Sequence, residues 1–280
     1  MTAPVISTED FRKFREFFYR KTGILFEDSK RYFVDKRLQE RIVKTGSDSF
    51  RNYFMQVRFE ACGSELQTLT NIMTVNETYF FREEYQFECL VKSMLPEIIR
   101  RKAPGEVIRI WSIPSSSGEE PYSIAIYLYE YWPELAQWDV ELISSDIDTS
   151  ILQKAKDGLY NTRSVQNLPP ALLNRHFEAQ GNGNYRISQE LRESVEFTRV
   201  NLSNLEETRQ YRGFDVVFCR NLLIYFDALS RTKAADVFYE ALNPGGFICL
   251  GHSESMSRIS SVFAVRKFPH AIVYQKPEER

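Results

Sequence analysis

The sequence predicts an α/β protein in which a doubly wound, mostly parallel sheet follows an all-helical N-terminal domain and carries a small β insertion. Two observations predict this class. Apolar residues recur at three- and four-residue spacing over residues 8–95, which is typical of helices, whereas short apolar strands alternate with helices from residue 106 onward. A chain of 280 residues has room for one large α/β domain and a small partner domain.

Composition excludes several classes of protein. The chain is 43% hydrophobic and 26% charged, and no apolar run reaches the ~18–20 residues of a membrane span. The N-terminus has no signal-peptide pattern, and the four cysteines form neither a metal clip nor a disulfide framework, so a cytoplasmic location is expected. The three histidines lack metal-ligand spacing, so no metal is expected. A net charge of −2 and a pI of 6.1 argue against general nucleic-acid binding.

Residues 1–75 are expected to form the helical domain. Their apolar residues keep helical spacing, as in the series Phe11, Phe14, Phe18 and the series Val34, Leu38, Ile42. Residues 1–60 hold 13 Lys/Arg and 9 Asp/Glu, a balance of +4, and residues 61–280 hold 23 and 29, a balance of −6. This asymmetry predicts a small basic module on an acidic body, although a solvated helical face would give the same balance. Residues 76–105 are expected to connect the two parts.

From residue 106 to residue 280 the expected elements alternate. Strands are predicted at 107–111, 140–146, 195–200, 214–220, 245–251 and 271–275. Helices are predicted at 118–132 and 149–156. Residues 157–194 break this alternation with prolines and glycines, so we expect a small β insertion there with a hairpin near 183–188.

The first strand–helix junction indicates what kind of ligand binds. Ligands of open α/β sheets lie at the carboxyl ends of the strands, and here the first strand runs into SIPSSSGEEPYS. This loop is neither GxGxxG nor a P-loop, and the helix opens with Glu119 and Glu120, which would repel a phosphate. A ligand with an ammonium group and no phosphate fits better, as in S-adenosylmethionine. The alternative is that both acids simply stabilise the first turn of the helix.

The second junction adds an acid in a position suited to a nucleoside. The predicted strand 140–146 ends in Asp146, and an acid at the end of the second strand hydrogen-bonds ribose hydroxyls in nucleotide-binding α/β folds. A strand-ending aspartate can also cap the next helix, a task open to Asp148 or Thr149 as well. Together with the first junction, the ribose interpretation is favoured.

Six segments form a combination far more specific than any single α/β motif. They are TVNETYFFRE (74–83), IWSIPSSSGEEPYS (110–123), SSDID (144–148), FTRVNL (197–202), FCRNLLIYFD (218–227) and NPGGFICLGHSES (243–255). Together they resemble CheR-type chemotaxis receptor methyltransferases, which are protein-glutamate O-methyltransferases that use S-adenosylmethionine. The resemblance covers roughly residues 10–275 and implies a Rossmann-like methyltransferase sheet. One departure is Ile113-Pro114-Ser115-Ser116, where the family loop reads close to AACS; Pro114 removes a backbone donor there.

The resemblance implies roles for residues on the first half of the chain. Asn76, Thr78 and Arg82 would close over the cofactor, which gives residues 76–105 a covering function. Glu119 would pair with the ammonium group of the cofactor, and Asp146 would hold its ribose hydroxyls. As plain alternatives, Asn76 and Thr78 would be helix caps.

It also implies roles for residues that follow the later strands. Asn201 and Leu202 would flank the adenine, and Cys219 and Arg220 would line the pocket under the methionyl part. Tyr225 would reach the transferring methyl group, so that Arg82 and Tyr225 are the candidate catalytic residues. The plain alternatives are a core position for Leu202, a buried small side chain for Cys219 and a packed aromatic for Tyr225.

The implied activity is methyl transfer to glutamate side chains of chemoreceptors, for adaptation in bacterial chemotaxis. A glutamate has a pKa near ~4.3, so it is already a nucleophile at pH 7 and needs no strong base. A nucleic-acid methyltransferase is disfavoured because CRNLLIY stands where such enzymes commonly carry [ND]PP[YF]. A non-catalytic S-adenosylmethionine-binding module is disfavoured because both Arg82 and Tyr225 are present.

Partners are inferred from charge and from the resemblance. On a helix through residues 30–44, a basic stripe forms beside the apolar face and would dock the acidic helical bundle of a receptor; four free solvated charges are the alternative. The stripe comprises Lys30, Arg37, Arg41 and Lys44. Some relatives also bind a receptor C-terminal peptide through the β insertion, but the short hairpin EAQGNGNYRIS (178–188) favours an enzyme that does not require it. We expect a monomer that binds no nucleic acid and does not insert into a membrane.

Overall fold

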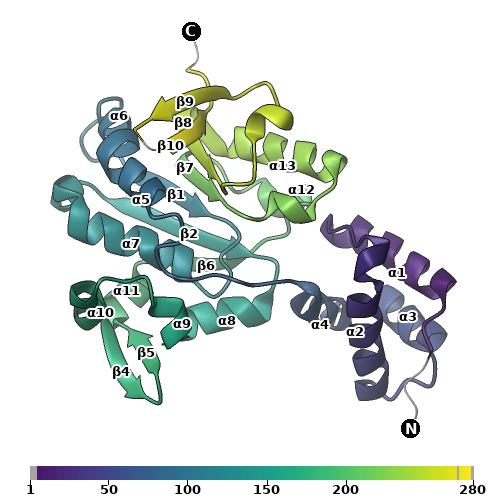
Figure 1. Cartoon of the computed structure of the whole chain (residues 1–280). Helices are drawn as coiled ribbons and strands as arrows, with labels where there is room; N and C mark the ends of the chain where they lie inside the picture. Colours follow the sequence, from purple (N-terminus) through teal and green to yellow (C-terminus); the bar gives the residue numbers. More distant parts are fainter. Residues whose placement is uncertain (1–4, 270, 279–280) are drawn as a thin grey trace.

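The computed structural model describes residues 5–269 and 271–278. Figure 1 shows a helical domain beside a larger domain built on one twisted sheet, with a small β-subdomain below that sheet. This arrangement confirms the predicted α/β class with an all-helical N-terminal domain and a small β insertion. Among the described residues, no helix is long and apolar enough to cross a membrane.

The helical domain consists of four helices around an aromatic core. They are α1 (Thr8–Thr22), α2 (Arg31–Lys44), α3 (Phe50–Phe59) and α4 (Ser64–Met73). Ser7 begins α1 with a capping box shared with Asp10, and Gly23 ends it in the left-handed region at φ 75°. Both predicted apolar series are buried in one core, which joins the four helices.

The central sheet has the strand order β6-β2-β1-β7-β8-β10-β9. Its strands are β1 (Ile108–Ser112), β2 (Val140–Asp146), β6 (Glu196–Arg199), β7 (Phe214–Cys219), β8 (Leu242–Leu250), β9 (Ala264–Phe268) and β10 (Ala271–Gln275). The first five are parallel, and β10 runs antiparallel to both β8 and β9. Because β1 lies between β2 and β7, the strand order reverses there, and the carboxyl ends of these three strands form the ligand edge.

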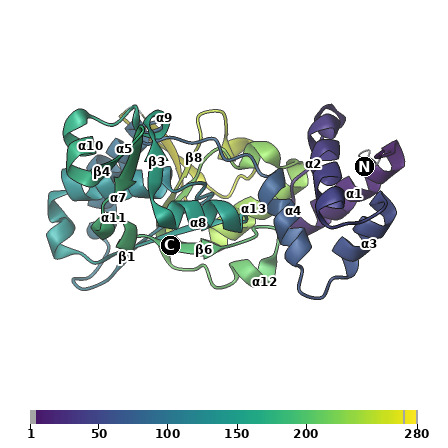
Figure 2. The same cartoon turned by 90° about the horizontal axis from the view of Figure 1, so that it is seen from below.

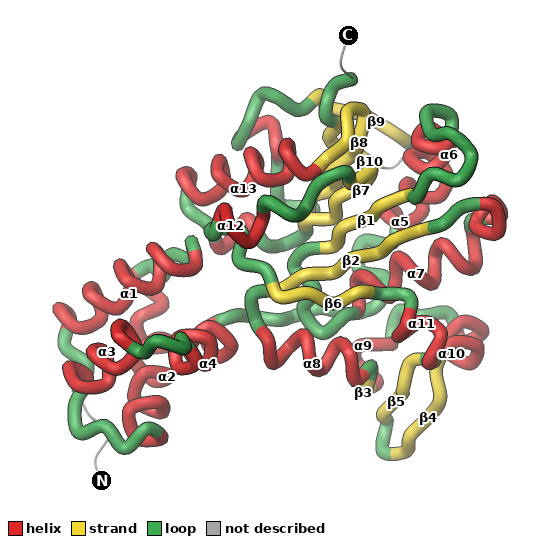
Figure 3. Tube along the Cα trace, turned by 180° about the vertical axis from the view of Figure 1, so that it is seen from behind, coloured by secondary structure: helices red, strands yellow, loops and turns green. Residues whose placement is uncertain are grey.

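Helices cover both faces of this sheet (Figure 3). One face packs against α7 (Glu119–Tyr131), α8 (Thr149–Asp157) and a helical run of α5 (Tyr85–Cys89), a π turn (Leu90–Met94) and α6 (Leu95–Ile99). The other face packs against α13 (Ala228–Ala241) around Trp111 and Phe238, with the short α12 (Leu205–Thr208) nearby. The apolar core therefore has two layers, one on each side of the sheet.

The β insertion is a three-stranded antiparallel sheet with short helices. Its elements are β3 (Leu159–Asn161), α9 (Thr162–Val165), α10 (Pro170–His176), β4 (Phe177–Gly181), β5 (Asn184–Ile187) and α11 (Gln189–Glu193). Asn182 and Gly183 both have positive φ and form the two-residue turn between β4 and β5. In Figure 2 this sheet lies at the opposite end of the molecule from the helical domain.

Several elements differ from the sequence prediction, among them the helix α13, which was not predicted. The edge strand β9 was not predicted, because Arg266 and Lys267 interrupt its apolar pattern; an edge strand tolerates such charges. The strand predicted at 245–251 begins at Leu242 in the structure, before Pro244 and Gly245.

Candidate functional site

A cavity of about 800 Å³ lies between the helical domain and the carboxyl ends of β1, β2 and β7. Both domains line it, through residues 24–30 and 73–79 on one side and residues 220–231 on the other. Six of the predicted site residues border it: Lys30, Asn76, Thr78, Arg82, Asp146 and Arg220, and Tyr225 joins them at the rim. The position at the sheet's strand-order reversal is where ligands of open α/β folds bind.

Asp146 is the buried acid at the floor of this cavity. Its two carboxylate oxygens accept backbone N–H groups, from Ser116 at 2.8 Å and from Asp148 at 3.0 Å. Burial raises the pKa of Asp146 to about 6, and these hydrogen bonds oppose the rise. Each oxygen keeps a lone pair for a further donor, which is the property a ribose-binding acid needs.

The β1–α7 loop supplies the wall beside Asp146. Its Ile113–Pro114 peptide bond is cis, and Ser116 has a positive φ of 48°. The hydroxyl of Ser116 is buried without a hydrogen-bond partner in the protein, although the residue lines the cavity. A buried orphan hydroxyl on a cavity wall fits a site whose polar ligand completes the hydrogen bonding.

Glu119 and Glu120 lie in two adjoining hollows, which share Asn76 and Thr78 in their walls. Glu119 lines the smaller hollow, of about 610 Å³; it accepts a hydrogen bond from Ser117 Oγ at 2.6 Å, and its pKa is raised by burial. Glu120 borders the main cavity. Successive helix residues point about 100° apart, so the two carboxylates reach different parts of this region.

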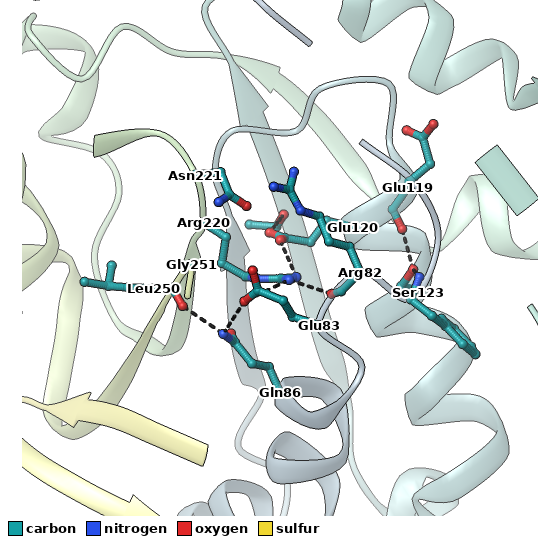
Figure 4. A network of polar contacts seen from close by, with 12 residues as sticks. Arg82, Glu83, Gln86, Glu119, Glu120, Ser123, Arg220, Asn221, Leu250 and Gly251 are labelled. Atoms are coloured by element: carbon teal, nitrogen blue, oxygen red, sulfur yellow. Dashed lines mark hydrogen bonds and ion pairs between the residues drawn. The ribbon is translucent and has the colours of Figure 1, made fainter. Parts of the chain in front are cut away.

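Arg220 links Glu120 to the segment that carries Arg82 (Figure 4). Its guanidinium donates to Glu120 at 2.9 Å and to the carbonyl oxygen of Arg82 at 2.5 Å, and lies 3.4 Å from Glu83. Burial raises the pKa of Glu120, whereas the Arg220 charge opposes that rise. Gln86 extends the network by donating to Glu83 and to the carbonyl oxygen of Leu250. The network therefore fixes the backbone of Arg82 and leaves its side chain at the cavity.

The two candidate catalytic residues both keep part of their side chains accessible: Arg82 is half-buried and Tyr225 is exposed. Arg82 lies between Phe81 and Glu83, both at positive φ, and donates to the carbonyl oxygen of Glu77 at 3.1 Å. Tyr225 is 38% exposed, and burial of the rest of the side chain raises its pKa above the usual value. Non-glycine residues at positive φ cost energy and cluster at functional sites.

Asn76 and Thr78 lie where the connecting segment crosses the cavity. The Asn76 side-chain amide donates to Asp148 at 2.9 Å, and Thr74 donates to the same carboxylate oxygen at 2.7 Å. Asp148 meanwhile caps α8 through the backbone N–H groups of Ser150 and Ile151. The segment is thus anchored to the start of α8, next to Asp146.

Besides Glu119, three residues predicted to bind the cofactor do not line the cavity. Asn201 donates its amide to the carbonyl oxygen of Lys21 and accepts from the backbone of Ser203, so its side chain joins the two domains. Leu202 belongs to the core around Trp111, and Cys219 is fully buried in β7, where burial raises its pKa strongly. For both residues the structure agrees with the alternative given above: Leu202 is a core residue and Cys219 is a buried small side chain.

The basic stripe on α2 is only half exposed. Arg41 forms a bidentate ion pair with Glu65 at 2.7 and 2.8 Å, and Arg37 stacks on Phe33 while donating to the carbonyl oxygen of Ile72. Both arginines therefore have partners within the helical domain, because α4 packs against that face of α2, so the alternative of four free solvated charges does not describe them. Lys30 and Lys44 are exposed.

Sequence reasoning did not assign three residues that shape the site: Ser116, Glu83 and Glu120. Each lies inside a quoted motif, but only the fold shows which member of a motif faces the cavity. In the described part of the chain, no cluster of histidine, cysteine or acidic side chains could hold a metal ion.

Three features are typical of the Rossmann-like class of S-adenosylmethionine-dependent methyltransferases. They are the sheet order, the acid at the end of β2, and a loop after β1 that lacks a phosphate-binding motif. Comparisons with known proteins make this assignment specific. Residues 9–74 match the family model described as "CheR methyltransferase, all-alpha domain", and residues 76–272 match "CheR methyltransferase, SAM binding domain".

Curated relatives match along nearly the whole chain. Chemotaxis protein methyltransferase 2 of Vibrio cholerae serotype O1 is 56% identical, with 100% of this chain and 96% of that protein covered. The chemotaxis protein methyltransferase of Salmonella typhimurium is 37% identical, with 93% and 88% covered. Chemotaxis protein methyltransferase Cher2 of Pseudomonas putida is 33% identical, with 95% and 97% covered. The chain belongs to the CheR methyltransferase family.

Proposed function

We propose that this protein transfers the methyl group of S-adenosylmethionine to glutamate side chains of chemoreceptors, giving glutamate methyl esters and S-adenosylhomocysteine. The proposal rests on one observation: Arg82 and Tyr225 are both accessible and border the same cavity as the buried Asp146. The rim therefore offers hydrogen-bond donors to an incoming carboxylate, and the floor offers acceptors to a nucleoside.

The acceptor group and the rim have complementary chemistry. A glutamate side chain is ionised at pH 7, so the reaction needs orientation more than a general base. The raised pKa of Tyr225 keeps its hydroxyl protonated, and it can therefore donate a hydrogen bond but not remove a proton. Arg82 can orient a carboxylate through two parallel hydrogen bonds. In-line alignment of this kind is worth up to about 7–11 kcal/mol of the barrier.

The cofactor supplies an electrophilic methyl carbon when it is bound. On the protein side, Asp146 would accept hydrogen bonds from the ribose hydroxyls, and the orphan hydroxyl of Ser116 would donate to the ligand. Glu119 would pair with the ammonium group from the adjoining hollow, because both carboxylate oxygens of Glu120 are already hydrogen-bonded, to Arg220 and to Ser112. Asn76 and Thr78 would cover the cofactor from the connecting segment.

The helical domain is the proposed receptor-recognition part, through the exposed Lys30 and Lys44 and not through the paired arginines. Lys30 lines the cavity, so its charge can attract the acidic helical bundle of a receptor toward Arg82. We further propose that the protein works in the cytoplasm as a monomer and does not require a receptor C-terminal peptide.

The test is methylation of receptor-containing membranes with S-adenosylmethionine labelled at the methyl group. We expect incorporated label that alkali releases as methanol, because esters hydrolyse in base and methylated amines do not. Membranes without chemoreceptor, and receptor in which the target glutamates are replaced by alanine, are the controls. Equal incorporation in these controls would contradict a glutamate of the receptor as the acceptor.

A further inference from the structure

A carboxylate outside the assigned site holds the turn that carries Arg220 and Tyr225. Glu254 lies in the loop after β8, within the segment GHSES. Its Oε2 accepts backbone N–H groups from Asn221 and Gly251, each at 2.8 Å, and its Oε1 accepts the N–H of Leu223 at 2.8 Å. One side chain thus satisfies three backbone donors, two of them on the turn after β7.

That turn has a conformation that needs external support. It leaves β7 at Cys219, passes through Asn221 at φ 58°, and continues into the 3-10 turn Leu223–Tyr225. Asparagine enters the left-handed region more readily than most residues with a side chain, but it still costs more there than glycine. The backbone N–H groups of Asn221 itself and of Leu223, two residues on, both donate to Glu254 and hold this conformation.

The close approach of the two loops is itself built into the chain. A Cβ atom at Gly251 would lie 2.7 Å from Asn221 Nδ2, 2.9 Å from Glu254 Oε2 and 3.0 Å from the backbone nitrogen of Asn221, so these groups would have to move. The absence of a side chain at residue 251 therefore lets the loop after β8 approach the turn this closely. Glu254 also donates its backbone N–H to the carbonyl oxygen of Gly251 at 2.9 Å, which closes its own loop.

We propose that Glu254 is a positioning residue for methyl transfer: it fixes the turn 220–225 so that Tyr225 meets the acceptor carboxylate at the cavity. Glu254 itself is not among the residues that line the cavity, and it acts through the backbone of Asn221 and Leu223. This role rests on the proposed function for its effect on turnover, but the hold on the turn is a property of the protein alone.

A carboxylate is required here because both of its oxygens face N–H donors. In Glu254→Gln, an amide NH2 group replaces one of those oxygens. The hydrogens of this group then point toward a backbone N–H. The shape of the side chain is kept, but at least one of the three hydrogen bonds is replaced by repulsion. Glu254→Gln therefore separates loss of the hold from loss of volume, and Glu254→Ala removes both.

The matched control is Asp215→Asn. Asp215 is also a buried carboxylate on β7: it accepts a backbone N–H from Arg109 at 2.9 Å and, unlike Glu254, also forms an ion pair with Lys102 at 3.1 Å, so its loss should cost the fold at least as much. It is at the opposite end of that strand from the turn, about 15 Å away at the usual rise per residue. Both variants lose a buried acceptor, but only Glu254→Gln disturbs the turn.

The experiment measures kcat, cofactor dissociation constant and amide hydrogen exchange for both variants and for Tyr225→Phe. We expect kcat of Glu254→Gln to fall roughly 10- to 100-fold, as for a catalytic group displaced by about 1 Å, with a smaller change in cofactor affinity. Its amides at residues 221–225 should exchange faster than in wild type. Asp215→Asn should keep wild-type kcat and wild-type exchange in that turn.

Two outcomes would overturn the proposal: a folded Glu254→Gln protein with wild-type kcat, or unchanged exchange at residues 221–225. Inactivity of the wild-type protein on receptors would instead contradict the proposed function. The exchange measurement then still decides whether Glu254 holds the turn, because it needs no acceptor.

Discussion

At the scale of single residues, Asp146 is the proposed acceptor for the ribose, and its burial bears on how cofactor binding depends on pH. Its pKa of about 6 lies above the ordinary value because the surrounding protein excludes water. The ionised carboxylate is the better acceptor for ribose hydroxyls, so cofactor binding favours loss of the proton. Affinity should therefore depend on pH in a range where most carboxylates do not titrate.

We predict that affinity for S-adenosylmethionine weakens as the pH falls from 7 to 5, through the pKa of Asp146. Near pH 6, calorimetry in buffers of different ionisation enthalpy should detect proton release on binding. Asp146→Asn should bind more weakly at pH 7, by on the order of 1–3 kcal/mol, and should lose this pH dependence. A wild-type pH profile in that variant would show that another group titrates.

Arg41 acts on the fold of the helical domain. Its ion pair with Glu65 is largely shielded from water, and Tyr53 donates to the same carboxylate at 2.6 Å. Removing Arg41 leaves the buried carboxylate of Glu65 with one neutral partner, the hydroxyl of Tyr53. Arg41→Ala should therefore lower the free energy of unfolding by about 3 kcal/mol, whereas the exposed Lys44→Ala should change it by less than about 0.5 kcal/mol.

Chemical denaturation measures both values. Arg41→Met combined with Glu65→Gln should recover part of the loss, because the unpaired charge is then absent. Equal stability of Arg41→Ala and Lys44→Ala would return Arg41 to the group of free surface cations.

Residue roles were predictable where a motif fixes both the residue and its direction. Asp146 ends a strand, so its place at the ligand edge follows from the sheet, and the structure puts it on the cavity. Arg37 and Arg41 share a helix face with Lys30, but the packing of α4 against this face depends on contacts between helices. Helical periodicity within α2 carries no information about that neighbour.

At the scale of elements, α4 and the start of α8 form a polar seam between the domains. Asn71 donates to the hydroxyls of Thr149 and Ser150 at 2.9 and 2.8 Å and accepts the backbone N–H of Thr149 at 3.0 Å. Gln67 donates to the carbonyl oxygen of Ile147 at 2.9 Å. The seam ends directly beside Asp146, so it couples the docking of the helical domain to the cofactor site.

We predict that Asn71→Ala loosens this seam by about 1–2 kcal/mol, the net value of one or two hydrogen bonds. Amides at residues 147–151 should exchange faster, and cofactor affinity should fall. Thr68→Ala is the matched control, because Thr68 lies on the same helix and donates only within it, to Ser64. Wild-type exchange in Asn71→Ala would mean that α4 is held by other contacts.

The elements themselves were predictable to different degrees. The strands β2 and β10 have the predicted bounds, because apolar and β-branched residues dominate them. The insertion was predictable only as a hairpin, since its strands β3 and β4 have mostly exposed side chains and lack a clear alternation. A strand held mainly by backbone pairing leaves little signal in the sequence.

At the scale of the whole molecule, the cavity exists only where the two domains meet. The helical domain contributes residues 24–30 and the catalytic domain residues 220–231, and the tyrosine of α1, Tyr19, donates to Asp227 at 2.9 Å across the junction. An acceptor that enters this junction touches both domains.

The most direct test of the account is the chemical identity of the modified residue on a chemoreceptor. Purified protein, receptor and S-adenosylmethionine are incubated, and the receptor is mapped by peptide mass spectrometry alongside measurement of S-adenosylhomocysteine. We predict one methyl group on glutamate side chains for each S-adenosylhomocysteine formed, and strong loss of both products in Tyr225→Phe. A methyl group on lysine, arginine or a chain terminus, or cofactor turnover without receptor methylation, would contradict the account.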